Sequence, residues 1–262
     1  MDYPKISIIS PSYNQGIFVE EAILSVLNQN YPNFEHIIID GGSKDNTVEI
    51  LKKYPHVKWV SEADEGQSDA INKGFNLATG DIIGWLNVDD YYLNNIFERI
   101  SNYLSGENTD AIYSNYYFVN SLGKITRNII TNINIPSLLL FYCYIPSTTF
   151  FFKRKILDEG IRIDKHFHIC MDKEFFAHIN KKFKIKFVND HFACFRWHDS
   201  NKSIDTLETK KIRYKEGINI LNRYGTFIRL NADKNLHLEI YRLMLTVLKP
   251  VKFLLKNISQ LK

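Results

Sequence analysis

The sequence predicts an α/β fold with a mostly parallel central sheet flanked by helices. Over the first 104 residues, short apolar runs rich in β-branched side chains alternate with segments of helical spacing. This order is typical of a parallel sheet with right-handed crossovers. The segments between these runs are short and contain Gly, Asn, Asp and Pro, which favour turns. A chain of 262 residues is long enough for one such domain with a sizeable core.

The individual elements follow from the length and spacing of the apolar runs. In the first part of the chain, strands are predicted over residues 5–10, 34–40, 57–60 and 81–86, and helices over residues 17–29, 46–54, 68–78 and 93–104. Beyond residue 110 the regular alternation stops. Predicted there are strands over residues 111–115, 148–152, 186–189 and 194–197, a hairpin over 116–130 that turns at 121–123, and a helix over 172–181.

Composition excludes several classes of protein. The net charge is only +4, from 33 basic and 29 acidic residues, which does not favour nucleic acid as a partner. Cys143, Cys170 and Cys194 are far apart and form no CxxC pair, so neither a zinc site nor a disulfide framework is expected. The first residues lack a signal-peptide pattern, and no apolar run reaches the roughly 18 residues of a membrane span. We therefore expect a cytoplasmic protein.

The last part of the chain, residues 206–262, is predicted to be helical. Between residues 236 and 261, apolar side chains recur at helical spacing and alternate with lysines, which predicts a basic amphipathic helix. Such a helix can lie on an anionic membrane surface, here the inner face of the cell membrane. The alternative is that it packs on its own domain or on a second subunit of a homodimer.

Polar residues follow three of the predicted strands. They form the segments PSYNQG (residues 11–16), DGGSKD (residues 40–45) and NVDD (residues 87–90). In open α/β sheets, ligands bind beyond the carboxyl ends of the strands. The three segments therefore predict one binding site at one edge of the sheet.

The acidic residues in these segments have a functional and a structural interpretation. Adjacent carboxylates such as Asp89 and Asp90 repel each other unless a cation is present, and Mg²⁺ or Mn²⁺ is typical of such a site. Alternatively, they cap the helix predicted to follow. Asp40 either accepts a hydrogen bond from a nucleobase or belongs to an ordinary Asp-Gly-Gly turn. The turn lacks the GxGxxG pattern, which argues against a dinucleotide cofactor.

The segments PSYNQ, IIIDGGSKDNT, EADEGQSDAINKGFNLATGDIIGWLNVDD, MDKEFF and FRWHDSNKS resemble glycosyltransferase family 2. The resemblance covers roughly residues 4–205. It implies the Rossmann-like GT-A fold, an inverting reaction, a nucleotide-diphosphate sugar as donor and a divalent metal, Mn²⁺ or Mg²⁺. The implied division is a GT-A domain over residues 1–205, with a nucleotide-sugar-binding half (1–110) and an acceptor-binding half (111–205), and a helical extension over 206–262.

The resemblance also implies roles for individual residues. Those expected to contact the donor are Pro11, Ser12, Tyr13, Asn14, Asp40, Gly42, Ser43, Asp69, Asn72, Lys73, Asn87, Val88 and Asp89. Among them, Pro11, Ser12 and Tyr13 would line the base and ribose, and Asp40 would bind the base. Asn87 and Asp89 occupy the two ends of the family's DXD motif. Because the first end is Asn87 rather than Asp, the metal is expected on Asp89 or Asp90, with His198 as a further ligand.

The expected general base is Asp172, which would accept a proton from the acceptor hydroxyl. Its alternative role is that of a surface or capping residue at a helix start. His198, with Arg196 and Lys202 nearby, would lie near the diphosphate, but His198 can also be a packed loop residue beside Trp197.

The resemblance implies transfer of a sugar, from a UDP-sugar, to a glycan or lipid-linked glycan, as in the synthesis of bacterial surface polysaccharides. Two other functions are compatible with the sheet: a sugar-phosphate nucleotidyltransferase and a non-catalytic nucleotide-sugar-binding protein. The first usually has a Gly-rich loop with Arg and Lys after the first strand, which PSYNQG lacks. The second would not need Asp172, Asp89 and Asp90 together.

Overall fold

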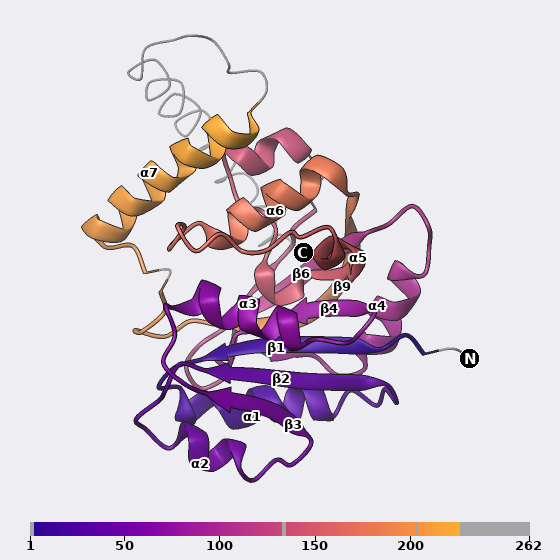
Figure 1. Cartoon of the computed structure of the whole chain (residues 1–262), viewed down its shortest axis with the longest axis vertical. Helices are drawn as coiled ribbons and strands as arrows, with labels where there is room; N and C mark the ends of the chain where they lie inside the picture. The colour runs from indigo at the N-terminus through magenta and orange to yellow at the C-terminus, as the bar shows by residue number, and fades with distance from the viewer. Residues whose placement is uncertain (1–2, 133–134, 203, 226–262) are drawn as a thin grey trace.

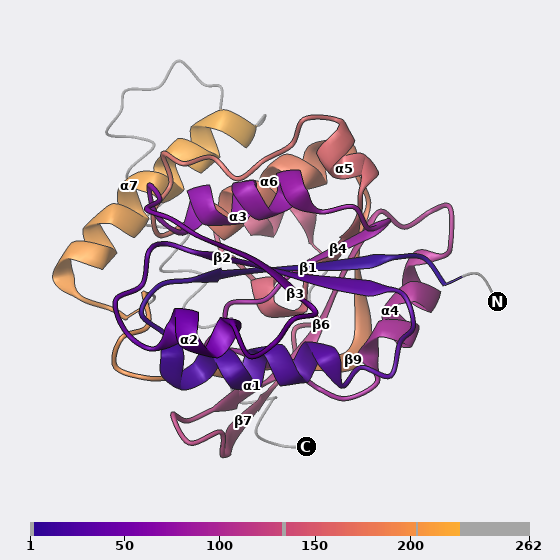
Figure 2. The same cartoon turned by 60° about the horizontal axis from the view of Figure 1, so that its bottom comes forward.

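The computed structural model describes residues 3–132, 135–202 and 204–225. Within these ranges a sheet of nine strands lies between helices on both faces (Figures 1 and 2). The strands follow the order β3-β2-β1-β4-β8-β6-β9-β5, and β7 pairs with β6. The predicted α/β fold with a mostly parallel sheet is therefore confirmed.

The first half of the chain forms the parallel part of the sheet. Its strands are β1 (Ile6–Ser12), β2 (Phe34–Asp40), β3 (Val57–Ser61) and β4 (Ile82–Trp85). Its helices are α1 (Gly16–Leu27), α2 (Thr47–Leu51), α3 (Gln67–Leu77) and α4 (Ile96–Leu104). In the β1–β2 register Ser12 pairs with Asp40, so the two strands end together and their loops meet at one edge.

Helices α1 and α2 cover one face of the sheet, and α3 covers the other together with α6 (Met171–Lys182) (Figure 2). A glycine brings α3 close to the sheet. A Cβ atom at Gly74 would lie 2.3 Å from Cγ2 of the fully buried Ile9, so no larger residue fits without a shift of the helix. This close packing places the first turn of α3 beside the ends of β1 and β4.

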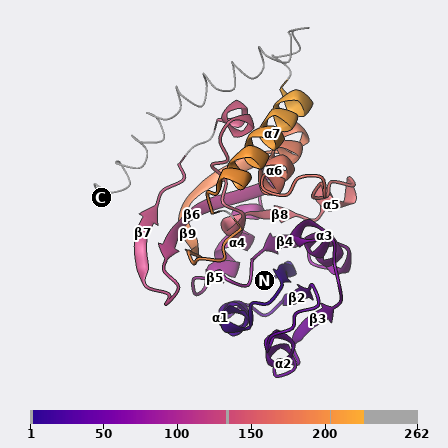
Figure 3. The same cartoon turned by 90° about the vertical axis from the view of Figure 1, so that its left-hand side faces the viewer.

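The second half of the chain completes the sheet. It contains β6 (Ala111–Val119), β7 (Ile125–Ile129), β8 (Phe151–Lys153) and β9 (Ile185–Arg196). Its helices are η1 (Pro136–Leu140), η2 (Ser147–Thr149), α5 (Lys155–Asp158), α6 and α7 (Leu207–Tyr224). Strand β5 (Tyr91–Tyr92), from the first half, pairs with β9. Strand β8 lies antiparallel between β4 and β6 and so joins the two halves. Figure 3 shows β7 far from β3; β7 pairs with β6 outside the main strand order, which ends at β5.

Three details differ from the prediction. Helix α4 begins at Ile96 with Asn95 as its N-cap, because the short strand β5 intervenes, so Asp89 and Asp90 do not cap it. Strand β9 is one continuous strand that ends at Arg196, where two separate strands were predicted over residues 186–189 and 194–197. The N-cap of α6 is Cys170, which leaves Asp172 without that role.

Helix α7 agrees with the helical pattern predicted from residue 206 onward. Residues 236–261, the predicted basic amphipathic helix, lie outside the described residues. Among the described helices, none has the length and apolar character needed to cross a membrane.

Candidate active site

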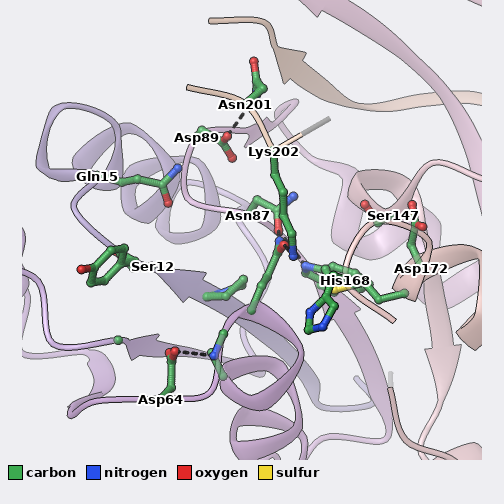
Figure 4. A pocket seen from close by; sticks show the side chains of 18 of the residues that line it. Ser12, Gln15, Asp64, Asn87, Asp89, Ser147, His168, Asp172, Asn201 and Lys202 are labelled. Atoms are coloured by element: carbon green, nitrogen blue, oxygen red, sulfur yellow. Dashed lines mark hydrogen bonds between the residues drawn. The ribbon is translucent and has the colours of Figure 1, made fainter. Parts of the chain in front are cut away.

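A pocket of about 760 Å³ opens at the edge of the sheet where β1, β2 and β4 end. This volume is within the range of small-molecule sites. One side is formed by residues of the loops after β1 and β3, including Ser12, Gln15 and Asp64. On the opposite side lie Ser147 and Asp172, with Asn87 and Lys202 between the two sides (Figure 4). The pocket therefore brings together segments that are up to about 190 positions apart in the sequence.

The loop after β1 lies at the pocket. Pro11, Ser12 and Tyr13 line it, as predicted, and Tyr13 is 59% exposed. The hydroxyl of Ser12 is buried, and among the described residues it has no hydrogen-bond partner. Since buried polar groups are nearly always paired, this hydroxyl is suited to a ligand that enters the pocket.

Asn87 lies in the middle of the pocket. Its Oδ1 atom accepts hydrogen bonds from Trp85 Nε1 at 2.8 Å and from Gln67 Nε2 at 2.9 Å. Gln67 in turn accepts a hydrogen bond from Lys202 Nζ at 3.4 Å. The amide oxygen of Asn87 is therefore occupied by protein donors, whereas a metal would need it free.

Asp89 and His198 form a pair at the pocket wall. Asp89 lines the pocket, and its Oδ2 atom lies 3.1 Å from His198 Nε2 and 3.3 Å from Asn201 Nδ2. The His198 ring packs on Phe18 at a centroid distance of 4.8 Å, and its Nδ1 atom lies 2.9 Å from Ser200 Oγ. A carboxylate and an imidazole suit a divalent ion whose other ligands are phosphate oxygens and water. No group of three or more metal-binding side chains occurs within the described ranges.

Asp90 has a different environment from Asp89. It is 1% exposed and does not line the pocket. Its Oδ1 atom accepts from the backbone N–H of Arg196 at 2.9 Å, and its Oδ2 atom accepts from Thr148 Oγ1 at 2.8 Å. Burial and the neighbouring Asp89 charge raise the pKa of Asp90 well above its usual value. The prediction that Asp90 holds the metal is therefore corrected, because both of its oxygens bind β9 and η2.

Asp40 also differs from its predicted role. Its carboxylate is fully buried and accepts hydrogen bonds from Ser43 N–H at 2.9 Å, from Ser61 Oγ at 2.6 Å and from the Ser43 hydroxyl. Gly41 lines the pocket, whereas Asp40 does not. In this conformation Asp40 organises the loop after β2 and makes no contact with the cavity.

Four other residues that were expected to contact the donor are likewise absent from the pocket lining. Ser43 Oγ accepts from the backbone N–H of Asn14 at 2.7 Å, which connects the loops after β1 and β2. Gly42, at φ 79°, occupies the left-handed region that glycine permits. Val88 is fully buried in the core. These four residues, Asn14, Gly42, Ser43 and Val88, support the walls of the site from behind.

The three predicted residues of α3 bind protein instead of lining the pocket. Asn72 forms two hydrogen bonds with the backbone of Ile163, at 2.8 and 3.0 Å. Asp69 forms ion pairs with Lys165 at 2.5 Å and with Lys73 at 3.3 Å. The Lys165 ammonium is the main cause of the lowered pKa of Asp69. In this conformation Asn72 and Asp69 join α3 to residues 163–165 of the second half, whereas Lys73 pairs with Asp69 and Glu62.

Arg196 is also buried and lies outside the pocket lining. Its Nε atom donates to the backbone carbonyl of Asp89 at 2.9 Å, and its guanidinium forms an ion pair with Glu21. It therefore holds the backbone of Asp89 in place.

Asp172 lies in the first turn of α6 and lines the pocket. Its Oδ1 atom accepts a hydrogen bond from the backbone N–H of Lys173 at 2.7 Å. Burial raises the pKa of Asp172, although that hydrogen bond and the charges of Lys173 and Lys202 act in the opposite direction. A carboxylate with a raised pKa in a pocket is suited to accept a proton.

A second carboxylate holds the chain just before Asp172. Glu216 of α7 is buried and accepts three backbone N–H hydrogen bonds. The donors are His168 at 2.7 Å, Ile169 at 3.0 Å and Cys170 at 2.7 Å. Because Cys170 is the N-cap of α6, Glu216 fixes the start of the helix that carries Asp172.

Several pocket residues were not predicted as site residues. They include Gln15, Gly41, Asp64, Gly66, Gln67, Ser147, His168, Met171, Phe195 and Asn201. Gln67 could have been found, since it follows Gly66, at φ 106°, where the chain turns into α3. Ser147 and His168 belong to no motif, and their position depends on how β8 and α6 pack.

Comparison with known proteins agrees with this geometry. Residues 7–196 match the family model described as glycosyl transferase family 2. A relative from Nostoc, named as an uncharacterized glycosyltransferase, is 24% identical over 88% of this chain and 80% of its own length. An Escherichia coli relative, UDP-Glc:alpha-D-GlcNAc-diphosphoundecaprenol beta-1,3-glucosyltransferase WfgD, is 27% identical over 81% of this chain and 84% of its own. A Haemophilus influenzae relative is 35% identical over 53% of this chain, and the aligned part is 58% of that relative's length.

Solved structures show the same fold. S. aureus TarS in complex with UDP-GlcNAc has a TM-score of 0.64 at 19% identity and covers 87% of this chain and 74% of its own. A Pyrobaculum calidifontis mannosyltransferase in complex with GDP-Man and Mn²⁺ has a TM-score of 0.58 at 15% identity, over 91% of this chain and 68% of its own. The expected GT-A fold is therefore confirmed.

Proposed function

This chain belongs to glycosyltransferase family 2, and we propose that it transfers a sugar from a nucleotide-diphosphate sugar, a UDP-sugar, to a hydroxyl group of a glycan or lipid-linked glycan. One observation carries the proposal. One pocket has Asp89, whose carboxylate pairs with His198, in its lining and the carboxylate Asp172 on the side away from Ser12. A displacement with inversion needs such an arrangement, because the base and the leaving group act on opposite sides of the reacting carbon.

The donor would bind along the ends of β1 and β4. The exposed ring of Tyr13 offers a stacking surface for the base, and the buried Ser12 hydroxyl offers an unpaired polar group. Asp89 and His198 would hold Mn²⁺ or Mg²⁺, which stabilises the negative charge on the departing diphosphate when it is bound. Lys202, which also lines the pocket, would add a positive charge near the same phosphates.

The acceptor would bind on the side of Asp172. Its hydroxyl would lose a proton to the Asp172 carboxylate as the oxygen attacks the sugar. The division of the GT-A domain at residue 110 remains part of this proposal. Residues before it would make most of the donor contacts, and residues after it would make the acceptor contacts and supply His198 and Lys202 near the diphosphate.

The acceptor class and cellular place are proposed from the relatives. The WfgD relative is named for an acceptor linked to diphosphoundecaprenol, which is a lipid. A lipid-linked acceptor in the synthesis of surface polysaccharides would place this chain at the inner face of the cell membrane. The predicted basic helix over residues 236–261 would supply peripheral contact there.

The proposal is tested by a matched pair of variants, Asp89→Asn and Asp90→Asn. Titration calorimetry of UDP with and without Mn²⁺, and release of UDP from a panel of UDP-sugars, are the two measurements. Asp89→Asn should abolish Mn²⁺-dependent binding and lower turnover at least about 100-fold, because it removes a charged ligand of the metal. Asp90→Asn should retain both, since its side chain lies outside the pocket. If Mn²⁺-dependent binding of UDP is unchanged in Asp89→Asn, the metal assignment is wrong.

A further inference from the structure

Four aromatic rings form a continuous cluster on the second half of the sheet. They are Tyr116, Phe118, Phe195 and Trp197, together called the aromatic strip. Phe118 lies 5.0 Å from Phe195 and 6.3 Å from Trp197, measured between ring centroids. Tyr116 lies 5.6 Å from Phe118 and 6.4 Å from Phe195. Each ring is therefore within contact range of at least two others.

The strand register explains why these rings share one face. Phe118 pairs with Phe195 across the parallel β6–β9 ladder, and Tyr116 is two residues before Phe118. Side chains two positions apart point to the same side of a strand. On the other edge of β6, Phe118 pairs with Arg127 of β7, whose guanidinium carbon lies 4.2 Å from the Phe118 ring centroid. The strip thus has a cationic, hydrogen-bonding neighbour on its outer side.

The strip is not part of the protein interior. Among the described residues, the two hydrophobic core clusters include none of the four rings. Trp197 is 45% exposed, and the other three rings are partly exposed. Aromatic side chains that are grouped but left accessible mark binding surfaces more often than scattered ones do.

The strip is continuous with the pocket. Phe195 lines the pocket, and the same lining includes Asp172 and Ser147. From Phe195 the rings lead away from the pocket, through Phe118, to the exposed Trp197. A molecule that presents a hydroxyl to Asp172 and extends outward would therefore lie along these rings.

We propose that the aromatic strip binds the sugar rings of the acceptor glycan that follow the one receiving the new sugar. This inference rests on the proposed glycosyltransferase function and adds to it a subsite for an oligosaccharide. A pyranose ring has an apolar face of C–H groups, which packs on an aromatic ring, and an edge of hydroxyl groups, which Arg127 can bind. A hydrocarbon chain would pack on the rings but form no hydrogen bond with Arg127.

The test compares Phe118→Ala and Trp197→Ala with Leu122→Ala. Leu122 is 89% exposed in the turn between β6 and β7 and lies outside the strip, so it is a matched control for the hairpin. With the UDP-sugar that the wild type uses, transfer is measured to free short oligosaccharides, and to an α-D-GlcNAc diphosphate acceptor with an alkyl chain, which has a single sugar and therefore no ring for the strip. Each strip variant should raise the KM for the oligosaccharides by about 3- to 10-fold, as expected for the loss of one aromatic contact, and should leave the KM for the single-sugar acceptor unchanged. The KM for the donor and the affinity for UDP should not change.

A binding measurement without turnover separates this inference from the proposed function. Saturation-transfer NMR with chitobiose and short glucans should show contact to the wild type and Leu122→Ala, and weaker contact to Phe118→Ala and Trp197→Ala. An equal acceptor KM and equal NMR contact in all four proteins would overturn the subsite and leave the glycosyltransferase function intact. Binding to anionic vesicles that depends on Phe118 and Trp197 would also overturn it, in favour of a membrane contact. If the wild type binds no UDP and releases none, the proposed function fails instead.

Discussion

Asp89 and Asp90 are adjacent in the sequence and point into different surroundings. Asp89 faces the pocket beside His198, whereas Asp90 faces the junction of β9 and η2. Burial and the Asp89 charge raise the pKa of Asp90 well above its usual value, so Asp90 holds a proton more tightly than an exposed Asp does.

These surroundings predict losses of different size in the free energy of unfolding for two substitutions of Asp90. Asp90→Asn should change the free energy of unfolding by less than about 1 kcal/mol, since an amide resembles the protonated acid in shape and keeps an acceptor for Arg196 N–H. Asp90→Ala should cost about 1–3 kcal/mol, because it leaves a buried N–H and the Thr148 hydroxyl without a partner. Urea unfolding followed by circular dichroism measures both. Equal losses in the two variants would show that the charge of Asp90, and not its hydrogen bonds, stabilises this junction.

Asp172 is expected to act in its ionised form, which sets a pH dependence. Burial raises its pKa, so activity should decline as the pH falls through that raised pKa, at a higher pH than for an exposed Asp near 3.9. Asp172→Asn should lower kcat by about 10²- to 10⁴-fold and lose this acidic limb, with UDP affinity retained. Asp158→Asn, an exposed site in α5, is the control. Near-normal turnover in Asp172→Asn would mean that another group is the base.

At the scale of elements, helix α7 supports the active site from outside the sheet. Glu216 accepts the backbone N–H groups of residues 168–170, and two of these residues, His168 and Ile169, line the pocket. The position of Asp172 therefore depends on a helix that contributes no residue to the pocket lining. Such a supporting contact acts on geometry and not on the chemistry itself.

Glu216→Ala should consequently lower kcat without weakening the binding of the donor. The three N–H groups lose their acceptor and the start of α6 shifts, and a displacement near 1 Å can cost about 100-fold in rate. UDP affinity should stay within about twofold, because most donor contacts lie in residues 11–89. Glu216→Gln keeps one acceptor oxygen and should recover part of kcat. The exposed Glu208→Ala, on the same helix, should behave as wild type. A parallel fall in UDP affinity would point to general loss of structure.

The same scale shows what the sequence could predict. The first four strands and helices were placed within a few residues, because each apolar run is bounded by turn-forming residues. Strand β9 was divided in two, since the polar residues 189–191 interrupt its apolar pattern. In the structure only His191 of these pairs with β6, and the register shifts between Ser114 and Asn115 and between Asn115 and Tyr116. Periodicity reports local pattern, and this pairing depends on a strand far away in the chain.

For the site, the sequence predicted which loops form the pocket more reliably than it predicted which side chains face the ligand. Pro11, Ser12, Tyr13, Asn87, Asp89, Asp172 and Lys202 do line the pocket. Asp40, Asp69 and Asp90 were expected at the ligand and instead bind protein groups. A motif identifies which residues occupy a loop, but the direction of each side chain depends on partners such as Ser61 and Lys165, which lie 21 and 96 positions away.

At the scale of the whole molecule, the pocket is formed by two separate stretches of chain. Its lining comes from residues 11–89, which include most of the proposed donor contacts, and from residues 147–202, which include Asp172. The two stretches meet in the sheet at β4 and β8, where Gly84 pairs with Phe151. A Cβ atom at position 84 would lie 2.5 Å from the Phe151 ring, so the residues at positions 84 and 151 have to be compatible in size.

That arrangement has a consequence for how such genes diversify. Each side of the pocket is encoded by one uninterrupted stretch of DNA, so a single recombination event between codons 90 and 146 would combine one parent's donor preference with another's acceptor preference. The hybrid would inherit both sides intact where its parents agree at the contacts that join the two stretches, among them Gly84 with Phe151 and Asp90 with Arg196. New linkages could then arise by exchange between relatives, without passing through intermediates in which both preferences change together.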